Sequence, residues 1–105
     1  MINPRVHSKP LKNIEILINS WEHAHHDAFR IREKVFIQEQ DVPEDMEIDQ
    51  FDDLAWHALA YQGDKAIGTG RLVLLGSDEG QIGRMAILPS FRGRGVGTRI
   101  LLSLI

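Results

Sequence analysis

The stretch QIGRMAILPSFRGRGVGTRILLSLI, residues 81–105, contains the change from strand to helix that decides the fold. Its first eight residues are predicted to form a strand that ends at Pro89, because proline cannot donate to a sheet. Three glycines follow, Gly93, Gly95 and Gly97, and an apolar helix is expected to begin near the second of them. Such a loop points free backbone N–H groups and the positive end of a helix dipole at one place. The stretch therefore predicts an anion site, with a phosphate or pyrophosphate as its ligand.

The side chains beside the glycines support this prediction. Arg92 and Arg94 supply local positive charge, and Thr98 adds a hydroxyl donor in the first helical turn. We expect the three glycines to allow positive φ angles and a close approach of the ligand. Two alternatives stay open. The glycines could serve only to end a strand and begin a helix, and the run RGRG could contact RNA.

Two common phosphate-binding patterns do not fit the loop. A P-loop places a lysine before its serine or threonine, whereas Gly97 is followed directly by Thr98. The dinucleotide fingerprint spaces its glycines differently and follows a parallel strand. The strands expected before this loop are antiparallel. Neither an NTPase nor a dinucleotide-binding fold is predicted.

Upstream, the chain alternates between strand and helix signals. Residues 1–13 are expected to be a flexible lead-in, and a half-buried strand is predicted from Ile14, with Ile16 and Ile18 on the same face. In DAFRIREKVFIQEQ the apolar residues recur at helical spacing, so a helix is expected to begin between residues 22 and 27. The acidic segment 42–53 is predicted to be a surface loop or short helix.

The centre of the chain predicts an antiparallel meander. AWHALAYQ (55–62) and KAIGTGRLVLL (65–75) are separated by Gly63 and Asp64, which favours a tight hairpin turn. A second turn, at 76–80, leads into the strand 81–88. The predicted fold class is therefore α/β, more strictly a mixed α+β sheet, in one domain over residues 14–105.

Composition limits the classes of function. The 105 residues carry 12 Lys plus Arg against 15 Asp plus Glu, a net charge of −3, which gives no whole-chain attraction to nucleic acid. No cysteine is present, so disulfides and thiolate chemistry are excluded. We find no signal-peptide pattern and no run of membrane-spanning length, and we expect no membrane association and a cytoplasmic protein.

A group of histidines raises the possibility of a metal site. EHAHH contains His23, His25 and His26, and His57 lies elsewhere. Neighbouring residues cannot share one helix face, so we expect these to be surface histidines and predict no metal site.

The segment LPSFRGRGVGTRIL resembles the acetyl-CoA signature of the GNAT acetyltransferase superfamily, Arg/Gln-x-x-Gly-x-Gly/Ala, with Arg92, Gly95 and Gly97 at the three defining positions. The order of predicted elements also resembles that family, and REKVFIQEQDVPEDMEIDQFDDLAWHALA (32–60) is similar to one bacterial branch of it. The resemblance implies the acyl-CoA N-acyltransferase fold over residues 14–105, in its N-terminal part only, without the last strands and helix.

The resemblance also implies a function. It implies an N-acetyltransferase that uses acetyl-CoA as co-substrate, without a metal, and passes the acetyl group to a primary amine of a small molecule or peptide by direct attack. Backbone groups of the loop would hold the pyrophosphate, and the strand before it would pair with the pantetheine arm and stabilise the oxyanion. The residues implied are Met85, Ala86, Ile87, Arg92, Gly93, Arg94, Gly95, Val96, Gly97 and Thr98.

The catalytic residues are not assigned. The family's usual acid is a tyrosine on a later helix, and Tyr61 does not match that position. Glu39, Glu47, Asp49 and Asp53 are near the expected acceptor side, but each is interpreted as a solvated surface charge.

The apolar end of the chain, ILLSLI, has no helix stop signal and suggests a domain cut short. A strand edge left exposed in this way would favour a homo-oligomer. The alternative function is a non-catalytic CoA-binding remnant or a half-domain that needs a partner.

Overall fold

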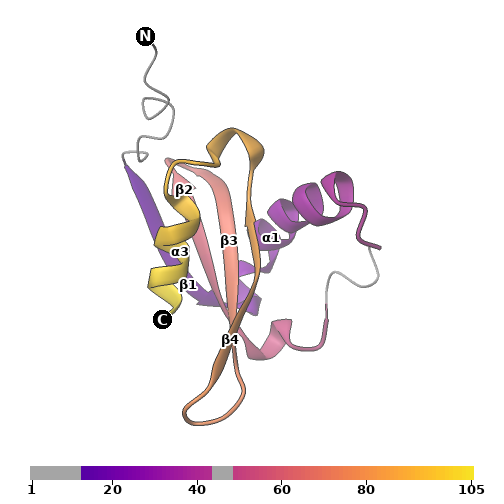
Figure 1. The fold of residues 1–105 in the computed structure, drawn as a ribbon, viewed down its shortest axis with the longest axis vertical. Helices are drawn as coiled ribbons and strands as arrows, with labels where there is room; N and C mark the ends of the chain where they lie inside the picture. Colours follow the sequence, from indigo (N-terminus) through magenta and orange to yellow (C-terminus); the bar gives the residue numbers. More distant parts are fainter. Residues whose placement is uncertain (1–12, 44–48) are drawn as a thin grey trace.

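The computed structural model describes residues 13–43 and 49–105, which form a four-stranded antiparallel sheet with a helix on each face (Figure 1). Residues 1–12 of the predicted lead-in lie outside the described residues. The elements, in chain order, are β1 (Ile14–Ser20), α1 (Trp21–Arg32), the π-helix η2 (Glu33–Glu39), the 3-10 turn η3 (Asp52–Leu54), β2 (Trp56–Gln62), β3 (Lys65–Leu74), β4 (Gly80–Ile87), the 3-10 turn η4 (Pro89–Phe91) and α3 (Val96–Leu104).

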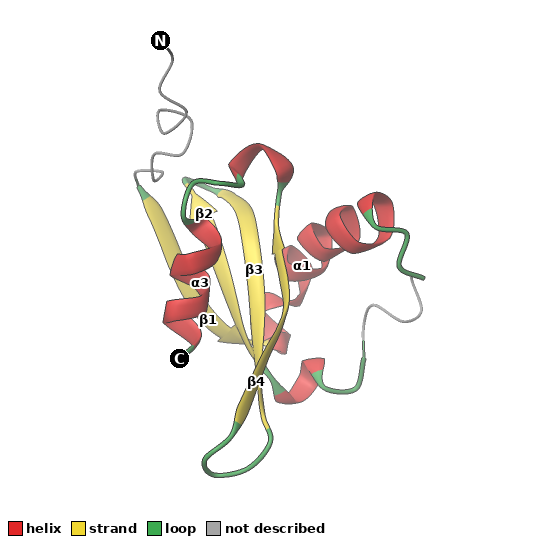
Figure 2. Ribbon diagram, in the orientation of Figure 1, coloured by secondary structure: helices red, strands yellow, loops and turns green. Residues whose placement is uncertain are grey.

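The sheet follows the order of the chain, β1-β2-β3-β4, with every neighbouring pair antiparallel. The β2–β3 turn is the predicted two-residue one, since Gln62 pairs with Lys65, and Gly63 there has a φ of 61°. This arrangement, drawn by element type in Figure 2, confirms the predicted meander and the mixed α/β fold class.

The two helices cover opposite faces of the sheet (Figure 1). Alanine and isoleucine side chains of α1, such as Ala28 and Ile31, pack with Leu59 of β2. On the other face Val96 and Ile100 of α3 pack against alternate residues of β1, β2 and β3. Burial of these apolar faces is the main source of stability that the sequence pattern encodes.

Helix α1 begins at Trp21, one residue before the predicted range of 22–27, and β1 ends directly before it, at Ser20. The helix then continues as η2, a π-helix, to Glu39. The alternation predicted for β1 holds only in part. Ile14 is buried, but the side chain of Ile18 is 41% exposed.

The acidic segment departs most from its prediction. Residues 44–48 lie outside the described residues, and part of the remainder forms η3. Asp52 is only 1% exposed, so its assignment to a surface segment is wrong. The physical reason is a set of arginine partners, described below, that compensates the buried charge.

Candidate functional site

The exit of β4 leads through a short, ordered turn into the glycine loop. Leu88 still donates its N–H to the Ile67 carbonyl at 2.9 Å, and Phe91 donates to the Leu88 carbonyl at 2.9 Å in the 3-10 turn η4. Gly93 and Gly95 then have φ angles of 73° and 83°. These left-handed conformations favour glycine, which explains why the loop needs glycine at both positions.

Helix α3 starts directly after this loop. Gly95 is its N-cap, with no side-chain cap, and the first helical bond is from the Arg99 N–H to the Gly95 carbonyl at 3.1 Å. The N–H groups of Gly95, Val96, Gly97 and Thr98 precede that bond and cannot have intrahelical acceptors. Together with the helix dipole they form a donor set for an anion.

An open hollow of about 270 Å³ lies at these groups, lined by Ile87, Phe91, Arg92, Gly93, Gly95, Val96, Gly97 and Thr98. A Cβ atom built on Gly93 or Gly95 would meet no atom within 4 Å, so the loop backbone faces open space. The prediction of a positive φ at Gly97 is wrong, because this residue is the second of α3 and helical. Its backbone is nevertheless accessible, since a Cβ there would contact only Ile87, at 3.9 Å.

The two loop arginines have different environments. Arg92 donates from Nη1 and Nη2 to the carboxylate of Glu39, at 2.8 and 2.9 Å, and from Nε to the Ile87 carbonyl at 2.8 Å. The hydrogen bond raises the pKa of Arg92 and lowers the pKa of Glu39. Arg94 is half-buried, does not line the hollow, and its enclosed Nε has no acceptor among the described residues. The positive charge predicted for Arg92 is thus present at the loop and is paired with Glu39.

Strand β4 is an edge strand of the described sheet, with β3 as its neighbour. Ala86 pairs with Thr69, and its side chain packs on the α1 side, whereas Met85 and Ile87 pack on the α3 side. Because the Leu88 N–H bonds to β3, the backbone groups of Ile87 face the open edge. The Ile87 carbonyl accepts a hydrogen bond from Arg92. The Ile87 N–H is therefore the remaining backbone group of this residue at the open edge, beside the hollow.

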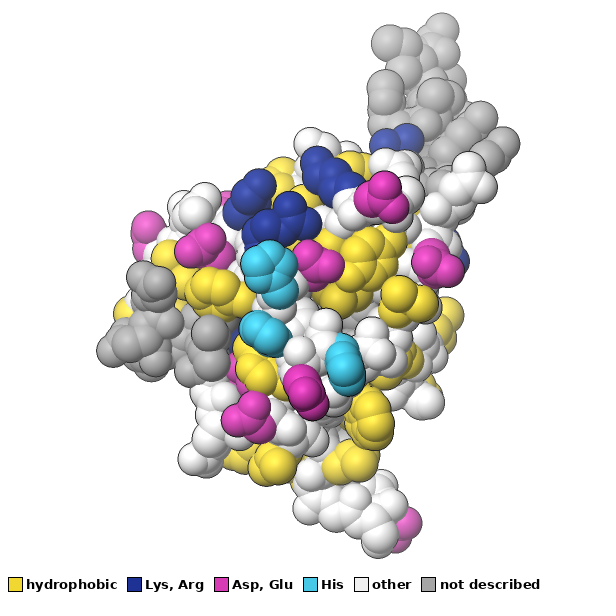
Figure 3. Space-filling model, turned by 180° about the vertical axis from the view of Figure 1, so that it is seen from behind, with side chains coloured by type: hydrophobic (Ala, Val, Ile, Leu, Met, Phe, Trp, Pro, Cys, Tyr) yellow, Lys and Arg dark blue, Asp and Glu magenta, His cyan; other side chains and the backbone are white. Residues whose placement is uncertain are grey.

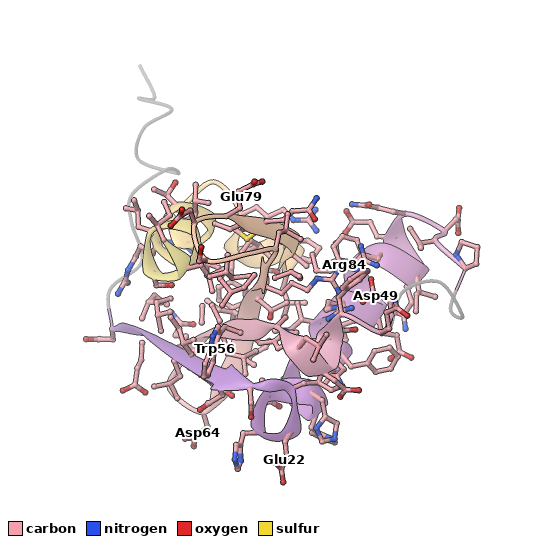
Figure 4. All side chains as sticks on the ribbon, turned by 90° about the horizontal axis from the view of Figure 1, so that it is seen from below. Glu22, Asp49, Trp56, Asp64, Glu79 and Arg84 are labelled. Atoms are coloured by element: carbon pink, nitrogen blue, oxygen red, sulfur yellow. The ribbon has the colours of Figure 1, made fainter. Side chains whose placement is uncertain are left out.

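A bulge interrupts β4 at Arg84 and Met85, just before Ala86. Thr69 pairs with Ala86 but Arg71 pairs with Gly83, so β4 has one residue more than β3 in this interval. Arg84, within the bulge, has a φ of 49°, an uncommon conformation for a residue other than glycine. Its side chain donates from Nη2 to Asp49 at 3.0 Å, and Figure 4 shows the two residues side by side.

Asp49 and Asp52 connect this bulge to the core through a network of ion pairs. Arg32 donates to both carboxylate oxygens of Asp52, at 2.8 and 3.1 Å. Arg71 donates to Asp49 at 2.7 and 3.0 Å and to Asp52 at 3.0 Å. Burial alone would raise the pKa of Asp52, but the hydrogen bonds and charges of Arg32 and Arg71 lower it below its ordinary value. The hydrogen bond from Arg71 likewise lowers the pKa of Asp49.

This network changes the interpretation of the candidate acidic residues. Asp49 is not a freely solvated charge, since it binds Arg71 and Arg84, and Glu39 is exposed but paired with Arg92. Asp53 is exposed, as predicted. Glu47 lies outside the described residues. Sequence reasoning missed Asp52, and the available signal was Arg71, a charged residue directly before the apolar residues 72–74 of β3.

The histidines divide into exposed and buried ones. His23, His25 and His26 are exposed on α1, as predicted, and Figure 3 shows histidine side chains gathered on that face. His57 is 1% exposed, so the surface interpretation is wrong for it. Its Nε2 lies 2.9 Å from the Asp52 carbonyl oxygen, and burial lowers its pKa. The described part of the chain has no group of three or more side chains suited to a metal ion.

Tyr61, on β2, makes a structural hydrogen bond to a residue of α1. Its hydroxyl donates to Asp27 at 2.6 Å, and burial together with this bond raises the pKa of Tyr61 to about 12. The group is thus a poor proton donor near neutral pH. In the described ranges, 13–43 and 49–105, we find no helix with the length and apolar character needed to cross a bilayer.

The geometry defines a class of protein. It has an antiparallel sheet between two helices, and the edge strand leads through a glycine loop to a helix N-terminus beside an open hollow. The model of the acetyltransferase (GNAT) family matches residues 16–105, and the chain belongs to this family.

Individual relatives agree with this assignment. The uncharacterized N-acetyltransferase YjcF of Bacillus subtilis (strain 168) is 40% identical over 78 residues, which are 74% of this chain and 55% of YjcF. The uncharacterized protein YyaT of the same organism is 39% identical over 79 residues, 72% of this chain and 53% of YyaT. The chain therefore spans about half the length of the curated relatives it matches.

Solved structures share the fold. A candidate N-acetyltransferase from Lactobacillus plantarum superposes with a TM-score of 0.78 at 28% identity, over 88% of this chain and 64% of that chain. ElaA of Escherichia coli superposes with a TM-score of 0.71 at 24% identity, over 86% and 66% respectively. At the identity of ElaA the likeness concerns the fold alone.

Proposed function

We propose that this chain binds acetyl-CoA and takes part in transfer of the acetyl group to a primary amine of a small molecule or peptide. The observation that carries the proposal is the donor set at the start of α3, which opens on a hollow at the exit of the edge strand β4. Membership of the GNAT family and the names of relatives such as YjcF support the reaction class.

The loop residues account for recognition of the pyrophosphate. Left-handed Gly93 and Gly95 bring the backbone close to the ligand, and the N–H groups of Gly95 to Thr98 donate to its oxygens. Binding by backbone groups does not depend on the charge of Arg92, which Glu39 already compensates.

The β4 edge accounts for the position of the acyl group. The pantetheine arm would lie along Met85, Ala86 and Ile87, as another strand would, and edge N–H groups there would be available to an oxyanion. Acetyl-CoA supplies the acetyl group as a reactive thioester. The chain's own contribution is to hold the donor in line for direct attack by the neutral amine.

Substitution of Gly97 by glutamate tests the binding site. The side chain has space within the protein, and a negative charge in the first turn of a helix is favourable for folding. The same charge repels a pyrophosphate at that place. In calorimetric titration we expect saturable binding of acetyl-CoA by the wild type and at least ~10-fold weaker binding by Gly97→Glu.

Leu102→Glu is the matched control, because it adds the same charge on the same helix at a side chain that is already 64% exposed. It should bind acetyl-CoA as the wild type does. Equal binding by Gly97→Glu and the wild type would show that the site is elsewhere. Thiol release in the presence of primary amines then separates a transferase from a protein that only binds CoA.

A further inference from the structure

We propose that Glu39 is a positioning residue for the acetyl-CoA loop, acting through Arg92 to fix the point where the loop leaves the edge strand. The inference deepens the proposed function and rests on it, because the loop that is fixed is the one assigned to the pyrophosphate.

The contact is a three-bond clamp made by one planar guanidinium. Arg92 binds both carboxylate oxygens of Glu39 and, through Nε, the carbonyl oxygen of Ile87, all at 2.8–2.9 Å. A two-point bond to a carboxylate fixes the plane of a guanidinium, which an ordinary single contact does not. With that plane fixed, Nε is directed at Ile87.

The clamp joins elements that are distant in sequence. Glu39 is the last residue of the π-helix η2, 53 residues before Arg92. Ile87 is the last residue of β4, and its carbonyl faces the open edge. One side chain thereby connects the helix that packs on the α1 side of the sheet to the end of the strand expected to hold the pantetheine arm.

The loop needs such a connection because its own residues hold it weakly. Gly93 and Gly95 have no side chains to pack, and their left-handed conformations compete with many others in a free chain. A fixed Arg92 removes part of that freedom before the ligand binds, which improves affinity by pre-organisation. Glu39 and Arg92 are 38% and 40% exposed, so the pair contributes little to global stability, and its effect is expected in the loop.

The test compares Glu39→Gln with Glu33→Gln, the same change at the other end of η2. Backbone 15N relaxation of the free protein reports the order of the loop without any ligand. We expect Glu39→Gln to lower the order parameters of the N–H groups from Arg92 to Thr98, with an unchanged melting temperature. The Glu33→Gln protein should match the wild type. Unchanged loop order parameters in Glu39→Gln would overturn the proposal.

Binding of acetyl-CoA provides a second, separate readout. Glu39→Gln should weaken binding by roughly two- to fivefold, the effect typical of an exposed ion pair. In an Arg92→Gln background the same change should have no further effect, because the partner is already absent. A full Glu39→Gln effect in that background would overturn the proposal. If the wild type itself does not bind acetyl-CoA, the proposed function fails, and the relaxation measurement alone decides whether Glu39 positions the loop.

Discussion

At the scale of single residues, buried charge is the main feature that the apolar pattern of the sequence does not indicate. Arg32 and Asp52 are each 1% exposed and form a two-point ion pair. A buried charge is tolerated only where partners compensate it, and here two arginines surround one aspartate. The same network reaches Arg84 in the β4 bulge through Asp49. Its role is to attach the 49–54 segment to the sheet beside the site.

We predict that Asp52→Asn is strongly destabilising. It removes the buried carboxylate charge that Arg32 and Arg71 both bind, and removal of one partner of a buried pair typically costs about 3–5 kcal/mol. Asp53→Asn makes the same change at the next residue, which is exposed, and should alter stability by less than about 0.5 kcal/mol. Urea unfolding of both variants measures the difference. Equal stability of the two would show that the network does not hold the fold.

At the scale of elements, close packing of α3 on β3 depends on two glycines. Gly68 and Gly70 lie beneath the helix, and a Cβ built on Gly70 would come nearest to the sulfur of Met85 on β4 and would approach Ile100 to 2.9 Å and Leu104 to 3.3 Å. The helix that carries the anion-binding donors is therefore seated directly on the sheet backbone. Displacement of α3 would also move its N-terminus relative to the β4 edge.

Gly70→Ala is predicted to destabilise the protein by about 1–3 kcal/mol, because an added methyl group overpacks the space that β3 shares with Met85 of β4 and with Ile100 and Leu104 of α3. Gly76→Ala serves as the control, since a Cβ there meets nothing within 4 Å. Thermal unfolding should separate the two variants clearly. A Gly70→Ala protein as stable as Gly76→Ala would contradict the packing described for this helix.

The element scale also shows what could be predicted from the sequence. The meander followed from alternation and from turn residues such as Gly63, and the loop followed from Gly93 and Gly95, because these signals are local in the chain. The clamp between Glu39 and Arg92 could not be predicted, since its members are 53 residues apart and each also suits a solvated surface. The burial of Arg32 could have been predicted, because Arg32 lies four residues after Ala28 on the buried face of the helix.

At the scale of the whole molecule, the two faces of the sheet contribute different parts of the candidate site. Helices α1 and α3 lie on opposite faces of the sheet (Figure 1). The donor set and the hollow lie at the start of α3 beside the exit of β4, and Glu39 of η2 contacts the same loop through Arg92. The central claim is that acetyl-CoA binds where these parts meet, at the exit of β4.

Chemical-shift mapping of the isotope-labelled chain during titration with acetyl-CoA tests this claim most directly. We predict saturable shifts for the backbone amides of Ile87, Gly93, Gly95 and Gly97, which lie at the strand edge and the start of α3. Amides on the exposed histidine face of α1 should not shift. Saturable shifts confined to other surfaces, or no shifts at millimolar acetyl-CoA, would contradict the account.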